Sequence, residues 1–316
     1  MNKIYKLLFN LNYYFLYKIF IFGFLFFTLS SILIVNNSSA FWSNDITNIS
    51  FKKSVYKGKK GKSYEIVTAD SGEPVIGKKS FKFTAIPFDC GASRYNNWYT
   101  DCGHVYQSSY SEKFKIGGGD RMRSEISTDN FKTSGEFWVS FSIFVPEDYV
   151  TISPTNVSMF QIWETNAGTN LMIEDMNGYL VAKQLVLNRR TDKYPKGQNP
   201  WPQLIKINDM RGKWTHFKIH TRQSDKMNKG FYKYYINGKL VAEYKGVTSD
   251  RRKEGMFLKA GIYQTGISFS MDKWKMSKEW KPRQDAGNFP TQIIYMDNIF
   301  YAKKESKLIK LLNKAK

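Results

Sequence analysis

Residues 137–145 read Phe-Trp-Val-Ser-Phe-Ser-Ile-Phe-Val and lead into Pro146-Glu147-Asp148. Apolar side chains occupy every second position, which is the repeat of a β-strand with one buried face. The proline and the two acids after it end the strand. Most of the chain continues in this way, as short runs of period two separated by Gly, Pro, Asn and Asp, with few helical patterns.

Further strands are predicted on both sides of this one. Residues 232–236 and 239–244 are predicted to form a hairpin, because Asn237-Gly238 favours a two-residue turn with positive φ at both positions. Residues 293–301 are predicted as a late strand. No internal repeat and no change of composition divides residues 63–302. We therefore expect an all-β protein with a single antiparallel sandwich, too large for an immunoglobulin domain and suited to a jelly roll.

Composition excludes several other classes of protein. The 316 residues include 42% hydrophobic residues and only two Cys, so the chain is not a disulfide-dense miniprotein, a coiled coil or a disordered tail. There are 48 Lys and Arg against 27 Asp and Glu, which gives a formal charge of +21. This surplus indicates an acidic partner, but charge alone leaves nucleic acid, membrane and polyanionic sugar open.

The first forty residues are predicted to be a secretory signal peptide. Three lysines, at positions 3, 6 and 18, precede a largely apolar run over residues 19–35. Small residues at Ser38 and Ala40 favour cleavage after Ala40. An uncleaved anchor is the alternative, because the apolar run lies at the lower limit for a membrane span. In both cases the rest of the chain is expected to be exported, to the periplasm or the exterior, which argues against nucleic acid as the partner.

The remaining segments follow from these boundaries. Residues 41–62 are predicted to be a Lys- and Gly-rich leader, residues 63–302 the β domain, and residues 303–316 a basic tail with a short amphipathic helix. The apolar positions of that helix are Leu308, Ile309, Leu311 and Leu312.

Cys90 and Cys102 bracket a polar, aromatic loop. An even pair in an oxidising compartment is predicted to form one disulfide, worth about 3 kcal/mol in the chain-entropy model. The sequence has no C-x-x-C and no H-E-x-x-H motif, so no catalytic zinc site is expected.

Alternation along four strands also predicts which polar side chains share a face. The shared faces hold, strand by strand, Arg121, Arg123 and Glu125; Gln161 and Trp163; Lys259 and Tyr263; and His216, Lys218 and His220. Each set is also what the solvated side of an ordinary antiparallel sheet would show. If the first three strands are neighbours, their side chains instead form a cationic groove fitted to sugar carboxylates, with Trp163 as a flat platform.

Several of these residues lie in motifs that resemble a known family. Residues 123–126 (Arg-Ser-Glu-Ile), 161–163 (Gln-Ile-Trp) and 258–264 (Leu-Lys-Ala-Gly-Ile-Tyr-Gln) resemble, in order, the R-S-E-L, Q-I-H and Y-F-K-A-G-x-Y-x-Q blocks of jelly-roll alginate lyases. The wider layout resembles the heparin lyase I-like and glucuronan lyase group of polysaccharide lyases. The resemblance covers roughly residues 85–302 and implies a concanavalin A-like β-jelly roll that cleaves a uronic-acid polymer by β-elimination.

The resemblance also implies roles for the residues of the groove. Arg123 and Gln161 would neutralise a sugar carboxylate so that the C5 proton becomes acidic. Tyr263 would protonate the departing glycosidic oxygen, and in some members of the family the same Tyr is also the base. Lys259 would either assist Tyr263 or hold a carboxylate. The full set of expected substrate-binding residues is Arg121, Lys259, Trp163, Glu125 and Gln264.

The identity of the base stays open because Trp163 replaces the His of the Q-I-H block. Glucuronan lyases take a His from an earlier loop, and His104, just after Cys102, would fill that place. His216 and His220 are the alternatives. If none of the three reaches the groove, Tyr263 would take both proton-transfer roles, as syn elimination allows.

Three other functions are alternatives to the lyase: a glycoside hydrolase, a lectin and an adhesion protein. A laminarinase-type glycoside hydrolase would need an E-x-D-x-x-E motif, and no Glu in this chain is followed two residues later by Asp. A non-catalytic, lectin-like jelly roll for acidic glycans is the main alternative, and an adhesion protein for the cell's own polysaccharide is a third. We expect a monomer without a required cofactor. A structural calcium is the optional exception, since some relatives hold one and Asp297 resembles a ligand.

Overall fold

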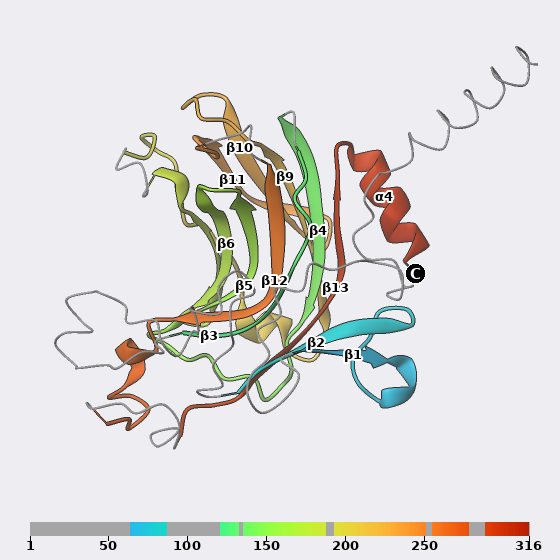
Figure 1. The fold of residues 1–316 in the computed structure, drawn as a ribbon, viewed down its shortest axis with the longest axis vertical. Helices are drawn as coiled ribbons and strands as arrows, with labels where there is room; N and C mark the ends of the chain where they lie inside the picture. The colour runs from blue at the N-terminus through green and yellow to red at the C-terminus, as the bar shows by residue number, and fades with distance from the viewer. Residues whose placement is uncertain are drawn as a thin grey trace, which may run out of the picture. The chain divides into compact units, whose positions relative to one another are not determined.

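The computed structural model describes residues 64–86, 121–132, 135–187, 193–250, 255–277 and 288–315. Within these residues the chain forms two antiparallel sheets and one α-helix of ten residues, α4 (Glu305–Lys314) (Figure 1). Three short 3-10 helices, η2 (Ala69–Ser71), η3 (Ile207–Met210) and η4 (Ile267–Ser270), lie in the described connections. The predicted signal peptide, the predicted leader, the predicted disulfide and His104 lie outside the described residues. Among the residues that are described, no helix combines the length and apolar character needed to span a membrane.

The seven-stranded sheet contains the strand predicted at residues 137–145. Its order is β1 (Tyr64–Thr68), β2 (Lys79–Ala85), β13 (Gln292–Ala302), β4 (Glu136–Phe144), β9 (Trp214–Arg222), β10 (Gly230–Ile236) and β11 (Lys239–Gly246). The hairpin between β10 and β11 has φ of 48° at Asn237 and 83° at Gly238. The predicted strands and their turn are therefore confirmed.

The six-stranded sheet joins strands that lie far apart in the sequence. Its order is β3 (Arg121–Ser127), β12 (Met256–Thr265), β5 (Asn156–Glu164), β6 (Gly168–Met176), β7 (Tyr179–Gln184) and β8 (Gln203–Lys206). Because β12 lies between β3 and β5, the three motif blocks become neighbours in space. The two sheets together form the predicted β-jelly-roll sandwich.

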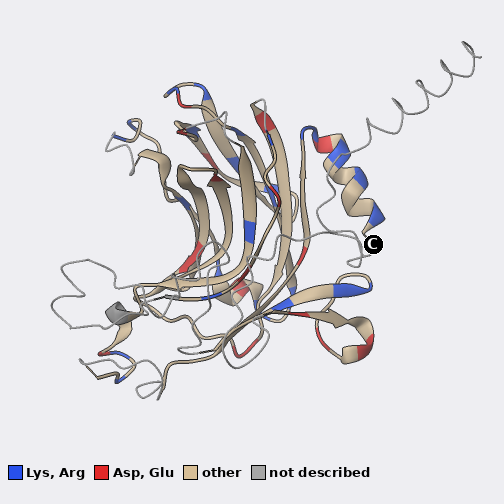
Figure 2. Cartoon of the chain, in the orientation of Figure 1, with Lys and Arg blue, Asp and Glu red and all other residues tan. Residues whose placement is uncertain are grey.

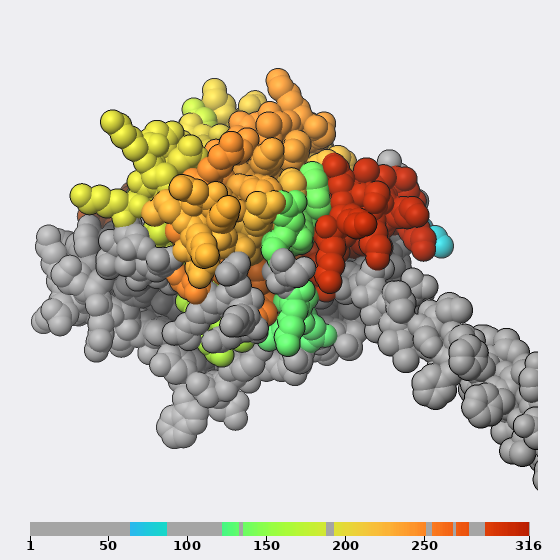
Figure 3. All heavy atoms as spheres, turned by 90° about the horizontal axis from the view of Figure 1, so that it is seen from above, coloured from blue at the N-terminus to red at the C-terminus, as the bar shows by residue number. Residues whose placement is uncertain are grey.

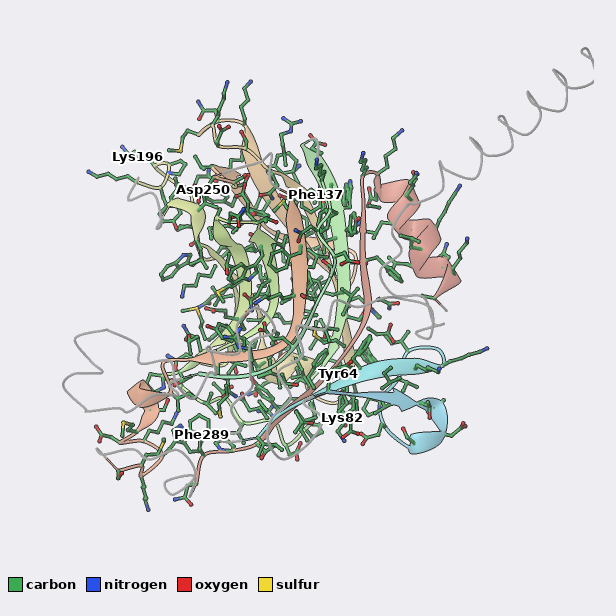
Figure 4. The ribbon with its side chains drawn as sticks, in the orientation of Figure 1. Tyr64, Lys82, Phe137, Lys196, Asp250 and Phe289 are labelled. Atoms are coloured by element: carbon green, nitrogen blue, oxygen red, sulfur yellow. The ribbon has the colours of Figure 1, made fainter. Side chains whose placement is uncertain are left out.

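The hydrophobic core fills the space between the sheets. Phe137, Val139, Phe141 and Ile143 of β4 are each at most 1% exposed, and Figure 4 labels Phe137 on this strand. The ring of Phe141 stacks on that of Phe160 from β5, with centroids 4.0 Å apart, so the sheets contact each other directly. Burying side chains of this size contributes about 1.5–3 kcal/mol each.

The outer side of β4 is less solvated than its alternation suggests. Ser140 and Ser142 are 2% and 1% exposed, because α4 packs against β4 and β13 and because both hydroxyls are hydrogen bonded. The helix predicted in the tail is confirmed, with Leu308 fully buried. Ile309, predicted to share the apolar side, is 47% exposed and faces away from the sheet.

Candidate functional site

The three motif strands bring six of the predicted side chains onto one face of the six-stranded sheet. Tyr263 lies opposite Arg123, and Lys259 lies opposite Gln161. The intervening residues of each strand, such as Ile126, Ile162 and Leu258, point into the core and are at most 2% exposed. We call the polar face the Glu125 cluster, which consists of Arg123, Glu125, Gln161, Trp163, Lys259 and Tyr263.

Glu125 lies at the centre of this cluster. Its carboxylate Oε1 accepts a hydrogen bond from Gln161 Nε2 at 2.5 Å, and Gln161 Oε1 accepts one from Trp163 Nε1 at 2.7 Å. The other carboxylate oxygen of Glu125, Oε2, lies 3.7 Å from Arg123 Nη1 and 3.9 Å from Lys259 Nζ. Glu125 is only 1% exposed, so the two cations are held by a carboxylate that water hardly reaches.

Both cations of the cluster also lie against aromatic rings. The Arg123 guanidinium carbon is 4.5 Å from the centroid of the Tyr263 ring, and Lys259 Nζ is 4.4 Å from that of Trp163. Trp163 stacks in turn on Phe257, with centroids 5.7 Å apart. Cation–π contacts of this kind contribute about 0.5–2 kcal/mol and fix the direction of long side chains. The cluster is therefore ordered before any ligand arrives.

Gly261 allows β12 to approach β3 closely between Lys259 and Tyr263. Its φ is 123°, and the pairing of β12 with β5 shifts by one residue between Ala260 and Tyr263. A Cβ at Gly261 would lie 2.1 Å from the carbonyl oxygen of Ser124, which no other residue could accommodate without moving the strand.

The same face continues across β6 and β7 with residues that the sequence analysis missed. Ser158 lies opposite Tyr263, and Glu174 lies opposite Ser158. Burial raises the pKa of the Glu174 carboxyl, and the charge of Lys183, 3.5 Å away, works in the opposite direction. Lys183 also lies 5.1 Å from the centroid of the Trp201 ring, which borders a pocket of about 420 Å³. In the sequence, Glu174 is an acid within an apolar run. Only the order of the strands shows that it lies opposite Ser158, on the face of the cluster.

Three predicted residues do not join the cluster. Gln264 follows Tyr263 directly, so alternation turns it into the core, where it is fully buried and its Nε2 donates to Gln292. Gln264 is therefore not part of the Glu125 cluster. His216 and His220 lie on β9 in the other sheet, and their neighbours Phe217 and Ile219 fill the core. The core separates both histidines from Tyr263, so neither can be its partner base.

The structure does not describe the side chains of four other predicted residues. Cys90, Cys102 and His104 lie outside the described residues, as does the side chain of Arg121, whose backbone pairs with that of Thr265. Their roles stay predictions.

Asp297, the expected calcium ligand, has both carboxylate oxygens in hydrogen bonds. Its Oδ2 accepts from Ser80 Oγ at 2.6 Å and its Oδ1 from the backbone N–H of Asn298 at 2.5 Å. Among the described residues, no three His, Cys, Asp or Glu side chains come together as metal ligands. A structural calcium stays a prediction.

Comparison with known proteins identifies the family. A family model described as polysaccharide lyase matches residues 52–300. No curated protein gives a significant match. Among solved structures, an endo-β-1,4-glucuronan lyase from the fungus Trichoderma reesei is 15% identical with a TM-score of 0.48, over 81% of this chain and 93% of that chain.

Two alginate lyases of polysaccharide lyase family 7 are also similar. One is 14% identical with a TM-score of 0.36, over 78% of this chain and 83% of that chain. The other, solved with substrate, is 13% identical with a TM-score of 0.40, over 83% and 87%. The family model matches well over half of the sequence. The chain belongs to the polysaccharide lyase family.

Proposed function

We propose that this lyase is exported and cleaves a uronic-acid polysaccharide by β-elimination at the Glu125 cluster. The observation that carries the proposal is that Arg123, Gln161 and Tyr263, from three different strands, lie on one face around a single buried carboxylate. A polyuronate offers what such a face would engage, namely a carboxylate for the cations and the amide, and a C5 proton next to it.

Arg123 and Gln161 would act on the carboxylate of the substrate. An indole N–H can only donate, so Trp163 holds the amide oxygen of Gln161 and leaves its NH₂ group turned toward Glu125. The amide therefore has one orientation. Donors fixed in advance stabilise the charge that develops on the enolate without having to reorganise. Glu125 would balance part of the positive charge that holds the sugar.

Tyr263 would carry proton transfer. In the elimination the C5–H bond breaks and its proton passes to a base. The electron pair forms the C4=C5 double bond, and the C4–O bond of the glycosidic link breaks as its oxygen takes up a proton. Tyr263 would donate that proton, and it would also be the base if no other group serves. His104 stays the predicted alternative base.

Incubation with alginate, glucuronan and heparin tests the proposal, because each elimination creates an unsaturated uronate that absorbs in the ultraviolet. We expect the absorbance to rise with at least one of these polymers. Binding without any rise across all three would instead support the lectin-like alternative.

Export has a separate test. The predicted signal supports it, and mass spectrometry of the mature protein should find a chain that begins at Phe41. A mature chain that retains residues 1–40 would favour the anchor instead.

A further inference from the structure

A second array of aromatic and basic residues lies on the outer face of the seven-stranded sheet. There β4, β9 and β10 pair in three rows that run across the strands. The residues between them, such as Phe137, Phe217 and Tyr232, point into the core and are at most 4% exposed. We call the outward residues the outer ladder. Its rows are Glu136, Arg222 and Phe231; Trp138, His220 and Lys233; and Ser140, Lys218 and Tyr235.

Rings and cations alternate along the outer ladder. Trp138 stacks flat on His220, with centroids 3.9 Å apart and planes 4° from parallel. Lys218 Nζ lies 5.1 Å from the centroid of the Trp138 ring and 4.8 Å from that of Tyr235. Because each cation is held against a ring, less side-chain entropy is lost when an anion binds.

The third ring of the outer ladder, Phe231, is flanked in the same way. Arg222 Cζ and Lys233 Nζ lie 5.5 Å and 5.9 Å from its centroid. Trp138, Tyr235 and Phe231 therefore each have a cationic side chain beside the ring.

The outer ladder leads into a basic pocket of about 480 Å³ at the end of β9. Arg222, Lys226 and Lys229 line it together with one carboxylate, Glu136. That carboxylate is already engaged, since it accepts hydrogen bonds from Arg222 and from His220. Lys226 and Lys229 form no ion pair with any described residue, so the pocket has an excess of positive charge.

The outer ladder is distinct from the Glu125 cluster because the hydrophobic core lies between the two sheets, which in sandwiches are about 10 Å apart. On its other side α4 borders the ladder, where Glu305 pairs with Lys218. Figure 3 shows β4 in green between the orange β9–β11 region and the red α4. In Figure 2 the basic positions occur on strands of both sheets and along α4, so the charge is not confined to one face.

We propose that the outer ladder and its pocket form a second, non-catalytic binding site for the acidic polysaccharide, which keeps the polymer on the protein while the other face cleaves it. The class of ligand rests on the proposed function. The ladder offers rows of cations and rings to an extended polyanion. Leu240, which is 46% exposed and lies opposite Tyr235, and Met227, which is 38% exposed beside Lys226, are the apolar groups that an anionic bilayer would engage, so vesicle binding is measured as the competing outcome.

Binding stoichiometry tests this proposal. Uronate hexasaccharides from alginate, glucuronan and heparin are titrated by calorimetry into the Tyr263→Phe variant, which cannot consume them. We expect two sites per chain. The triple variant Lys226→Ala, Lys229→Ala, Lys233→Ala should lose one of them, with affinity reduced at least about tenfold, equivalent to about 1.4 kcal/mol.

A matched control separates a local site from long-range attraction. The variant Lys78→Ala, Lys213→Ala, Lys314→Ala removes the same charge from exposed positions away from the pocket and should keep both sites. One site in the parent protein, or equal losses in the two triple variants, would overturn the proposal.

The remaining outcomes distinguish this proposal from the proposed function. Cleavage of a polymer by a protein with only one site leaves the lyase mechanism intact and rejects the outer ladder. Loss of an outer site in a protein that cleaves none of the polymers rejects the mechanism and keeps the ladder. Binding to phosphatidylglycerol vesicles without any hexasaccharide on this face would assign it to a membrane and overturn the proposal.

Discussion

Asp297 provides a quantitative prediction about stability. It lies on β13, is 8% exposed, and accepts hydrogen bonds from Ser80 and from the backbone N–H of Asn298. Burial raises the pKa of its carboxyl from 3.8 to about 6, and the two hydrogen bonds offset only part of that effect. The folded protein therefore binds this proton more tightly than the unfolded chain does.

The sign and size of the effect follow from linkage. Because the pKa is raised on folding, the free energy of unfolding falls as the pH rises from about 4 to about 6. The difference between about 6 and 3.8 corresponds to at most about 3 kcal/mol lost above pH 6. Asp297→Asn keeps the shape of the side chain without the charge. It should raise the free energy of unfolding at pH 7.5 by about 2 kcal/mol after a weakened hydrogen bond is allowed for, and change it little at pH 4.

Denaturant unfolding at pH 4 and pH 7.5, in the presence of a chelator, measures this difference. Asp209→Asn is the control, because Asp209 is exposed. An equal effect of Asp297→Asn at both pH values would mean that the charge of Asp297 is not the cause. The same experiment with added calcium tests the predicted metal, since a calcium ion on Asp297 would stabilise the parent protein and make Asp297→Asn destabilising.

Three further substitutions test the packing and the site. Gly261→Ala should destabilise by more than about 3 kcal/mol in denaturant unfolding, whereas Gly178→Ala, which shares a positive φ but has open space around it, should cost less. Leu308→Ala should cost about 2–5 kcal/mol and Ile309→Ala little; equal losses would contradict the packing of α4. Trp163→Phe keeps a ring near the lysine but removes the indole donor to the amide, so kcat/KM on the cleaved polymer should fall about fivefold, and an unchanged value would contradict that role.

The sequence predicts which face a side chain takes more reliably than which sheet it joins. Alternation placed Arg123, Gln161 and Tyr263 on the polar sides of their strands, and the structure confirms each. The same argument put His216 and His220 on a polar face, but nothing local reveals that β9 belongs to the other sheet. Pairing between strands depends on contacts that are distant in sequence, which periodicity does not report.

Two other differences have particular physical causes. Gln264 was assigned from a motif against the alternation that turns it inward, and alternation prevails because the core side of β12 is buried. Glu174 and Lys183 were missed because periodicity does not report the strand order β5, β6, β7. That order extends the polar face of the cluster across these two residues. An acid directly after three apolar residues is the sequence signal by which Glu174 could have been predicted.

Tyr263→Phe separates proton transfer from binding at the Glu125 cluster. This variant removes one oxygen and keeps the ring beside Arg123, so the cluster should keep its geometry and its affinity for the polymer. The measurement is the ultraviolet absorbance of unsaturated uronate ends, followed with the polymer that the parent protein cleaves, alongside binding of the same polymer. We expect turnover to be lost while binding stays nearly unchanged. Undiminished turnover would contradict it.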